Sequence, residues 1–258
     1  MANLDTLNKI KNSIQFADDS KVNYWSERLG KQLKGYVQIV HGLHIFEPLL
    51  YRIRKHNAGS DNLTKAKNYS YFLCSSMLWC PQKQSCARAN LPFERRLYMS
   101  TTPETAMREC DIKAGDEFTL AKIKPKYKAG WYALKPILLG FGKYEKYYPE
   151  LYAEEKKVIN HNPVLAKFLS DSFIEDADHS SYCFTQLIAS KIFTVPEMKC
   201  IIYPSTKYPY SKGLNIAYKA DEADHNFEFE WAKVCRCTGE NTYTPLHEYK
   251  DLSQPPFQ

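Results

Sequence analysis

The sequence predicts an α+β domain with an added helical segment at its N-terminus, and three observations support this. Segments with the two-residue period of strands alternate with segments of helical period, but without the regular strand–helix–strand rhythm of a parallel sheet. The hydrophobic fraction of 44% in 258 residues is enough for a packed core. No repeat or low-complexity tract appears. We therefore expect a helical extension at 1–47 and one domain over 48–258 that includes a C-terminal tail.

The N-terminal extension is marked by apolar residues at helical spacing, which are Trp25, Leu29, Leu33, Val37 and Val40. We expect this stripe to pack on the parent domain. A first strand follows at 48–54, with the alternation of a half-buried strand. Polar residues clustered over 55–70 then indicate a loop, and a loop beside a strand is a common place for ligand contacts.

The central block LYMSTTPETAMRE at 97–109 predicts a strand, a turn and a helix. Thr102 before Pro103 is a good helix start, because the threonine hydroxyl caps the first turn and proline fits its geometry. The helix continues to Glu109, so Tyr98 on the strand and Glu109 on the helix can face one shared cleft. The segment DEFTLAKIK at 116–124 has the alternation of a further strand.

Aromatic residues are frequent over 130–160 and are interleaved with lysines. We expect them to cover the core rather than to stack on nucleic-acid bases. A helix opens at Asn162-Pro163, and its predicted apolar face is Val164, Leu165, Phe168 and Leu169. Another helix follows around 187–193. A strand at 199–203 is stopped by Pro204, which leaves Ser205 at a strand end, where a side chain can point into a site. The last predicted strand is 214–218.

The composition argues against a membrane protein, a secreted protein and a metal-binding protein. No window has the long uncharged apolar run of a membrane span. The start MANLDTLNKIKNS lacks the apolar stretch of a secretory signal, so we expect a cytoplasmic protein with no membrane partner. The eight cysteines include no CxxC pair, and we expect neither disulfides nor a metal site. The net charge of +6 is spread along the chain and suits an anionic small ligand as well as a nucleic acid.

Four motifs, in this order, resemble those of the RES-domain proteins, a family named for an arginine, a glutamate and a serine. They are LLYRIR around residue 52, ARAN at 87–90, LYMSTTPETAMRE at 97–109 and IIYPSTKYPYSKGLN at 201–215. The resemblance covers about residues 48–220. It departs from the family pattern at Ala87, where the family has glycine, and at Lys199 and Cys200, where an aspartate–glycine pair often stands.

The resemblance implies a fold and an activity. The fold is a mixed-sheet core like that of the ADP-ribosyltransferases. The activity is that of a toxin from a toxin–antitoxin system, which cleaves the nicotinamide–ribose bond of NAD. NAD is then the substrate, with no further cofactor, and a helix-turn-helix antitoxin is the expected protein partner. The acceptor stays open between water, phosphate and a protein side chain.

The resemblance assigns catalysis to Arg52, Glu109 and Ser205 and substrate binding to Arg88, Asn90, Tyr98 and Asn215. The residue types suit this chemistry. Cleavage of the bond develops positive charge on the ribose, which the Glu109 carboxylate can stabilise. A guanidinium binds pyrophosphate bidentately, for which Arg52 and Arg88 are the candidates. Tyr98 offers a stacking surface, and Ser205 offers a hydrogen bond to ribose or nicotinamide.

Three alternatives stay open from the sequence. Arg54 is a rival for Arg52, because the two side chains lie on the same face of one strand. The protein can be a module that binds a nucleotide or a partner without catalysis. It can also bind nucleic acid through its basic aromatic stretch, which we do not expect, and steep salt dependence of binding would be the sign of it.

Overall fold

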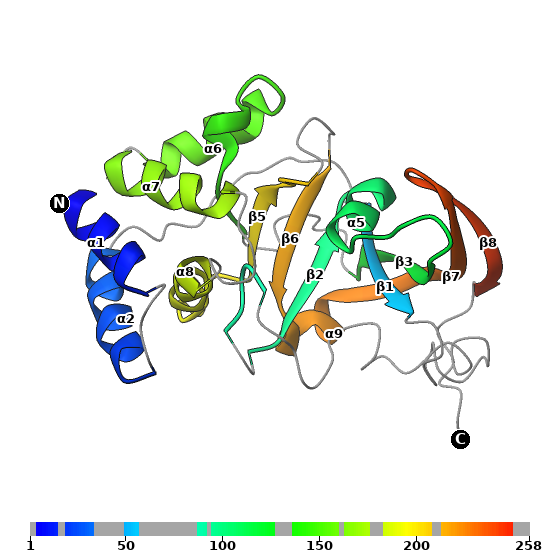
Figure 1. Ribbon diagram of the computed structural model, residues 1–258, viewed down its shortest axis with the longest axis horizontal. Coiled ribbons are helices and arrows are strands. Elements are labelled where there is room, and N and C mark those ends of the chain that lie inside the picture. Colours follow the sequence, from blue (N-terminus) through cyan, green and yellow to red (C-terminus); the bar gives the residue numbers. More distant parts are fainter. Residues whose placement is uncertain are drawn as a thin grey trace.

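The computed structural model describes residues 4–14, 19–33, 49–56, 87–91, 94–126, 136–159, 163–175, 183–207 and 213–249. Within these ranges the protein is an α+β fold built on one eight-stranded sheet (Figure 1), so the predicted α+β class is confirmed. The strands are β1 (Leu50–His56), β2 (Arg96–Ser100), β3 (Glu117–Pro125), β4 (Pro136–Leu138), β5 (Cys200–Pro204), β6 (Leu214–Lys219), β7 (Phe227–Gly239) and β8 (Thr242–Tyr249).

The sheet is mixed, and its strand order is β4-β5-β6-β2-β1-β3-β7-β8. The β4–β5 pair is parallel, and the other neighbouring pairs are antiparallel. Five of the strands correspond to those predicted from the sequence, which are β1, β2, β3, β5 and β6. The predicted loop at 55–70 begins too early, because β1 continues through His56; residues 57–70 lie outside the described ranges.

Two strands that were not predicted follow β6 and extend the sheet to Tyr249. β7 pairs with β3 along its length, and β8 pairs with β7 to form the edge of the sheet. Asn241 in the turn between them has a φ of 58°, a left-handed conformation that asparagine tolerates. Charged side chains such as Glu228, Glu230 and Arg236 interrupt the apolar alternation by which a strand is recognised in a sequence. β7 forms nevertheless, because it pairs with the distant strand β3.

Helices cover both faces of the β4–β5–β6 half of the sheet. They are α1 (Leu4–Ile14), α2 (Asp19–Leu33), α6 (Pro149–Ile159), α7 (Pro163–Ile174) and α8 (Cys183–Phe193), and a 3-10 turn η3 (Phe141–Tyr144) precedes α6. Ile201 and Tyr203 of β5 pack in one cluster with α1, α2, α7 and α8. The alternate residues Cys200 and Ile202 pack in a second cluster, with η3 and α6, on the opposite face. Figure 1 shows the first group of helices gathered beside β5.

The N-terminal helices are part of this core. Leu29 and Leu33 of α2 are buried and Trp25 packs against the same cluster, as the helical stripe predicts, whereas Val37 and Val40 lie outside the described residues. Among the predicted apolar residues of α7, Val164 is 45% exposed, because the second residue of the helix faces away from α1 and the sheet. Within the described helices, none combines the length and the apolar character needed to cross a membrane.

The aromatic-rich stretch covers the core, as predicted, in the part that the structure describes. Phe141, Tyr144 and Tyr148 are buried, and the rings of Phe141 and Tyr148 pack edge to face with centroids 5.7 Å apart. Tyr147 is exposed and Lys146 lies over its ring. These contacts account for the aromatic residues through packing rather than through base stacking.

Candidate functional site

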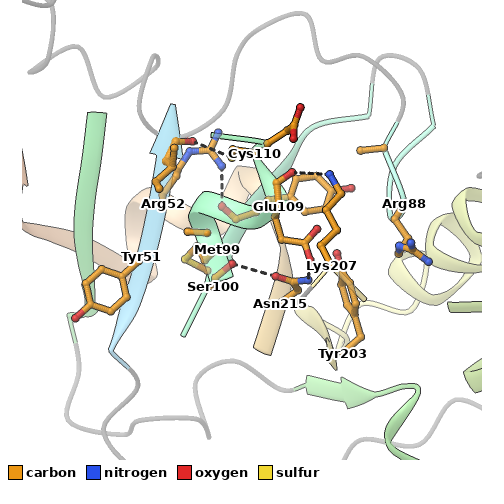
Figure 2. A pocket seen from close by; sticks show the side chains of 15 residues that line it. Tyr51, Arg52, Arg88, Met99, Ser100, Glu109, Cys110, Tyr203, Lys207 and Asn215 are labelled. Atoms are coloured by element: carbon orange, nitrogen blue, oxygen red, sulfur yellow. Dashed lines mark hydrogen bonds between the residues drawn. The ribbon is translucent and has the colours of Figure 1, made fainter. Parts of the chain in front are cut away.

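A row of side chains crosses the middle of the sheet on one face. Tyr203 of β5 is opposite Asn215 of β6, Asn215 is opposite Ser100 of β2, and Ser100 is opposite Tyr51 of β1. Directly opposed residues of antiparallel strands point to the same face, so these four side chains stand side by side. All four line a cavity of about 500 Å³ (Figure 2).

The cavity lies where β1 and β2 separate. Along their described lengths these two strands share one register pair, Tyr51 with Ser100, whereas β1 and β3 share seven. Beyond that pair the Nη1 of Arg52 donates a hydrogen bond to the main-chain oxygen of Tyr98 at 2.8 Å. The guanidinium thus links β1 to β2 beyond their one register pair. Arg52, and not its rival Arg54, is among the residues that line the cavity.

The helix α5 (Pro103–Glu109) lies over this row of side chains, and its start is fixed by local chemistry. The Thr102 hydroxyl accepts a hydrogen bond from the Thr105 amide at 3.2 Å, as predicted for the cap. Gly213 before β6 permits close approach to this turn, because a Cβ at Gly213 would lie 1.7 Å from the Thr105 hydroxyl oxygen. The amide of Leu214 also donates to the Thr101 hydroxyl at 2.8 Å. These contacts set the position of α5 relative to β6.

The end of α5 is held by the turn between β7 and β8. Arg108 donates through Nε to the side-chain oxygen of Asn241 at 3.0 Å and also pairs with Glu240. After Glu109 the chain leaves the helix at once, and Asp111 has a φ of 49°. The two C-terminal strands, which the sequence did not predict, therefore help to place the helix that carries Glu109.

Glu109 is held by two donors from the strands beneath it. Its Oε1 accepts hydrogen bonds from the Ser205 hydroxyl at 2.6 Å and from Nδ2 of Asn215 at 2.7 Å. Its Oε2 has no hydrogen-bond partner among the described residues, and Glu109 lines the cavity. The carboxylate is thus fixed through one oxygen while the other is available to a ligand.

The Ser100 side chain completes this network and was not predicted as a site residue. Its hydroxyl donates to Oδ1 of Asn215 at 3.0 Å, and both side chains are buried. With Oδ1 engaged in this way, the amide of Asn215 presents its nitrogen to Glu109. A signal was present in the sequence, because Ser100 is two residues after Tyr98 on one strand and therefore shares its face.

Ser205 follows the end of β5, as predicted, but its side chain does not line the cavity. It is fully buried and gives its hydroxyl to Glu109. In this arrangement Ser205 positions the carboxylate rather than contacting a ligand directly.

Tyr98 lines the cavity and is anchored at its hydroxyl. The hydroxyl accepts a hydrogen bond from the Ala89 amide at 3.0 Å and donates to Oδ1 of Asn90 at 2.8 Å. Asn90 is fully buried behind the ring and is not among the residues that line the cavity. The ARAN block therefore orients the tyrosine ring, and this is the contact that the structure gives to the predicted Asn90.

Arg88 lines the cavity, but its Nη1 is directed at the end of α7. This nitrogen donates to the main-chain oxygens of Phe173 and Glu175, the latter at 3.1 Å. In Figure 2 the guanidinium of Arg88 lies apart from Glu109. A cation at the C-terminus of a helix is favourable, because carbonyl groups there lack helical partners. These contacts join the ARAN block to α7.

Cys110, next to Glu109, also lines the cavity. Burial raises the pKa of its thiol to about 11, and the neighbouring Glu109 also raises it, against the effect of Arg52. The thiol is therefore protonated at neutral pH and is a poor nucleophile. Glu109 is accordingly the better candidate for chemistry in this cavity.

Lys207 also lines the cavity and was not predicted as a site residue. It is exposed, and its Nζ donates to the main-chain oxygen of Glu109 at 3.2 Å. The charged residues of the lining are the cations Arg52, Arg88 and Lys207 and the anions Glu109 and Asp111. Within the described ranges, no three His, Cys, Asp or Glu side chains gather in a way that would hold a metal ion.

No protein family matches the sequence, and no curated protein sequence matches it.

Proposed function

We propose that this protein consumes NAD by cleaving the bond between nicotinamide and ribose, with Glu109 as the catalytic carboxylate. The observation that carries the proposal is the geometry of Glu109, whose Oε1 is held by Ser205 and Asn215 at 2.6 and 2.7 Å while Oε2 is left for a ligand. Residues that the RES-domain resemblance names from separate motifs meet within hydrogen-bond distance. If the resemblance were due to chance, these residues would not be expected to lie next to one another.

The chemistry follows from the charge. As the C1′–N bond breaks, its electron pair leaves with nicotinamide, and positive charge develops on the ribose. A fixed carboxylate stabilises that charge without having to reorganise. The two hydrogen bonds to Oε1 fix the carboxylate in advance of the reaction. Oε2 is then the atom that faces the sugar or holds its hydroxyl groups.

The remaining lining suits a nucleotide. A cavity of about 500 Å³ is within the range of small-molecule sites. Tyr98 presents an anchored ring to a base or to nicotinamide, and Arg52 places a guanidinium beside the carboxylate for the anionic part of the substrate. The acceptor is left open between water, phosphate and a protein side chain.

The same resemblance leads us to propose a cytoplasmic toxin that is restrained by a helix-turn-helix antitoxin. Uncontrolled loss of NAD harms a cell, so expression alone should arrest growth. The antitoxin would insert a segment into the cavity that Arg52 and Tyr98 line. Growth and intracellular NAD after induction test this part, and growth arrest with an undiminished NAD content would contradict it.

The direct test of the activity is incubation of the purified protein with NAD, followed by mass analysis of the products. We expect free nicotinamide together with ADP-ribose, phosphorylated ADP-ribose or an ADP-ribosylated protein, according to the acceptor. If NAD binds and stays intact, the protein is a binding module without catalysis. If NAD does not bind and nucleic acid binds with steep salt dependence, the protein is a nucleic-acid-binding protein.

A further inference from the structure

Lys207 differs from the other cations of the cavity in its partners. The Nη1 atoms of Arg52 and Arg88 are directed at main-chain oxygens of β2 and α7. Lys207 extends from the chain after Ser205, and among the described residues its Nζ makes one hydrogen bond, to the main-chain oxygen of Glu109 at 3.2 Å. An ammonium group has three N–H donors, so two are available to a ligand.

Among the described residues, no carboxylate forms an ion pair with Lys207, because no Asp or Glu oxygen lies within ion-pair distance of its Nζ. Asp111, the other acidic residue of the lining besides Glu109, pairs instead with Lys113 at 3.4 Å. The ammonium therefore contributes an uncompensated positive charge at an exposed border of the cavity, where it attracts anions.

The positive charge of Lys207 can offset the negative charge of Glu109 when an anionic substrate binds. A substrate that carries phosphate groups meets repulsion from the Glu109 carboxylate, and that repulsion grows as the phosphates come closer. Figure 2 shows Arg52 on one side of Glu109 and Lys207 on the other. A phosphate that bound Lys207 would be held on the Lys207 side of Glu109, and the ammonium could keep its hydrogen bond to the main-chain oxygen of Glu109.

We propose that Lys207 binds the pyrophosphate of the substrate in addition to Arg52 and makes the cavity selective for phosphate-bearing nucleotides over nucleosides. This inference rests on the proposed function and names the part of the substrate that the cavity recognises. Lysine binds phosphate as a mobile point charge, whereas Arg52 is held in place by its bond to Tyr98. Lys207 therefore contributes to binding and not to the breaking of the bond.

The test is the binding of ADP-ribose and of adenosine, measured by calorimetry, to the Glu109→Gln protein. In that background we compare Lys207→Met, which keeps the length of the side chain, with Lys207→Arg, which keeps the charge. Lys143→Met on η3 is the control, because Lys143 is also exposed and does not line the cavity. We expect Lys207→Met to weaken ADP-ribose binding roughly tenfold, as for a lost hydrogen bond to a charged group, with adenosine binding unchanged.

Lys207→Arg should bind ADP-ribose with most of the affinity of the Glu109→Gln parent. Added salt should weaken ADP-ribose binding less in Lys207→Met than in that parent. Equal ADP-ribose affinity in Lys207→Met and the Lys143→Met control would overturn the inference, and so would an equal loss for adenosine. Absence of ADP-ribose binding in the parent would overturn it as well. Because binding is measured without turnover, a protein that binds ADP-ribose through Lys207 and leaves NAD intact would contradict the proposed function alone.

Discussion

At the scale of single residues, the site depends on donors that hold Glu109. Replacement of Ser205 by alanine removes one of the two hydrogen bonds to Oε1 and leaves the carboxylate freer to turn. We predict that Ser205→Ala lowers kcat for NAD about tenfold, in keeping with the loss of one hydrogen bond to a charged group, with little change in KM. Steady-state kinetics measure both constants. Ser172→Ala is the control, because Ser172 is also buried and bonds within α7; equal kinetics in the two variants would contradict the positioning role.

The two arginines of the cavity should differ in what their loss does. Arg52→Ala should weaken NAD binding, because Arg52 lines the cavity beside Glu109, with at most a small loss of stability. Arg88→Ala should mainly lower the free energy of unfolding, by about 1–3 kcal/mol, because it leaves the carbonyls of Phe173 and Glu175 without their charged donor. Calorimetric titration with NAD and urea unfolding separate the two effects. The reverse pattern would give the anion-binding role to Arg88.

Site residues could be named from the sequence where they belong to a motif with a known role. Arg52, Glu109 and Tyr98 were named from the sequence, and the structure brings them into one cavity. The burial of Ser205 and Asn90 behind that cavity was not predictable, because it depends on which neighbouring strand each side chain meets. Lys207 lies within the 201–215 motif, but the resemblance gives it no role, and its place in the cavity is recognised only from its distance to Glu109.

At the scale of elements, α5 is positioned by contact with Gly213. We predict that Gly213→Ala lowers the free energy of unfolding by about 1–3 kcal/mol, the usual cost of overpacking, because its Cβ would lie 1.7 Å from the Thr105 hydroxyl oxygen. It should also lower kcat by displacing Glu109. Urea unfolding and NAD kinetics measure the two effects.

The control for this substitution is Gly30→Ala in α2, where the nearest atoms to a new Cβ are 3.8 Å away. Alanine favours a helix over glycine by about 0.5–1 kcal/mol, so Gly30→Ala should leave stability unchanged or raise it. If Gly213→Ala behaves in the same way, close packing against Thr105 does not position α5.

Elements with local signals were predicted well. Thr102 and Pro103 define the start of α5 through hydrogen bonds within four residues, and the short alternating runs of β2 and β3 were equally clear. β7 and β8 were not predicted, because β7 is stabilised by pairing with β3, more than a hundred positions earlier in the chain. Local sequence carries little information about such pairing.

At the scale of the whole molecule, the site lies at a seam in the sheet. The β4-β5-β6-β2 half carries Ser205, Asn215 and Ser100, and the β1-β3-β7-β8 half carries Arg52. The two halves meet at one register pair between β1 and β2, and the cavity occupies the place where they diverge. The α+β class was predictable from the rhythm of the elements. The strand order, and with it the seam, was not, because it is decided by long-range pairing.

Stability of the whole molecule should depend on His56 at the end of β1. Burial lowers the pKa of His56, and Arg54 lowers it further, against the effect of Glu117. The folded state therefore binds a proton less readily than the unfolded chain, whose histidine titrates near 6.5. The contribution of His56 to stability is present above pH 6.5 and is lost as the pH falls through its folded pKa.

We predict that the free energy of unfolding falls more between pH 7.5 and pH 5 in the parent than in His56→Gln. Both proteins share all the other titrating groups, so the difference between the two decreases isolates His56. Urea unfolding at the two pH values measures it. Equal decreases in parent and variant would show that His56 does not control the loss of stability.

The central claim, that Glu109 breaks the nicotinamide–ribose bond, is tested most directly by the rate of nicotinamide release from NAD by Glu109→Gln. The control is Glu104→Gln, which makes the same chemical change on the same helix at a residue that does not line the cavity. We predict a loss of roughly 10²–10³-fold or more in Glu109→Gln, as for removal of an electrostatic stabiliser, with unchanged unfolding and with parental rates in Glu104→Gln. Release of nicotinamide by folded Glu109→Gln at the parental rate would contradict the claim.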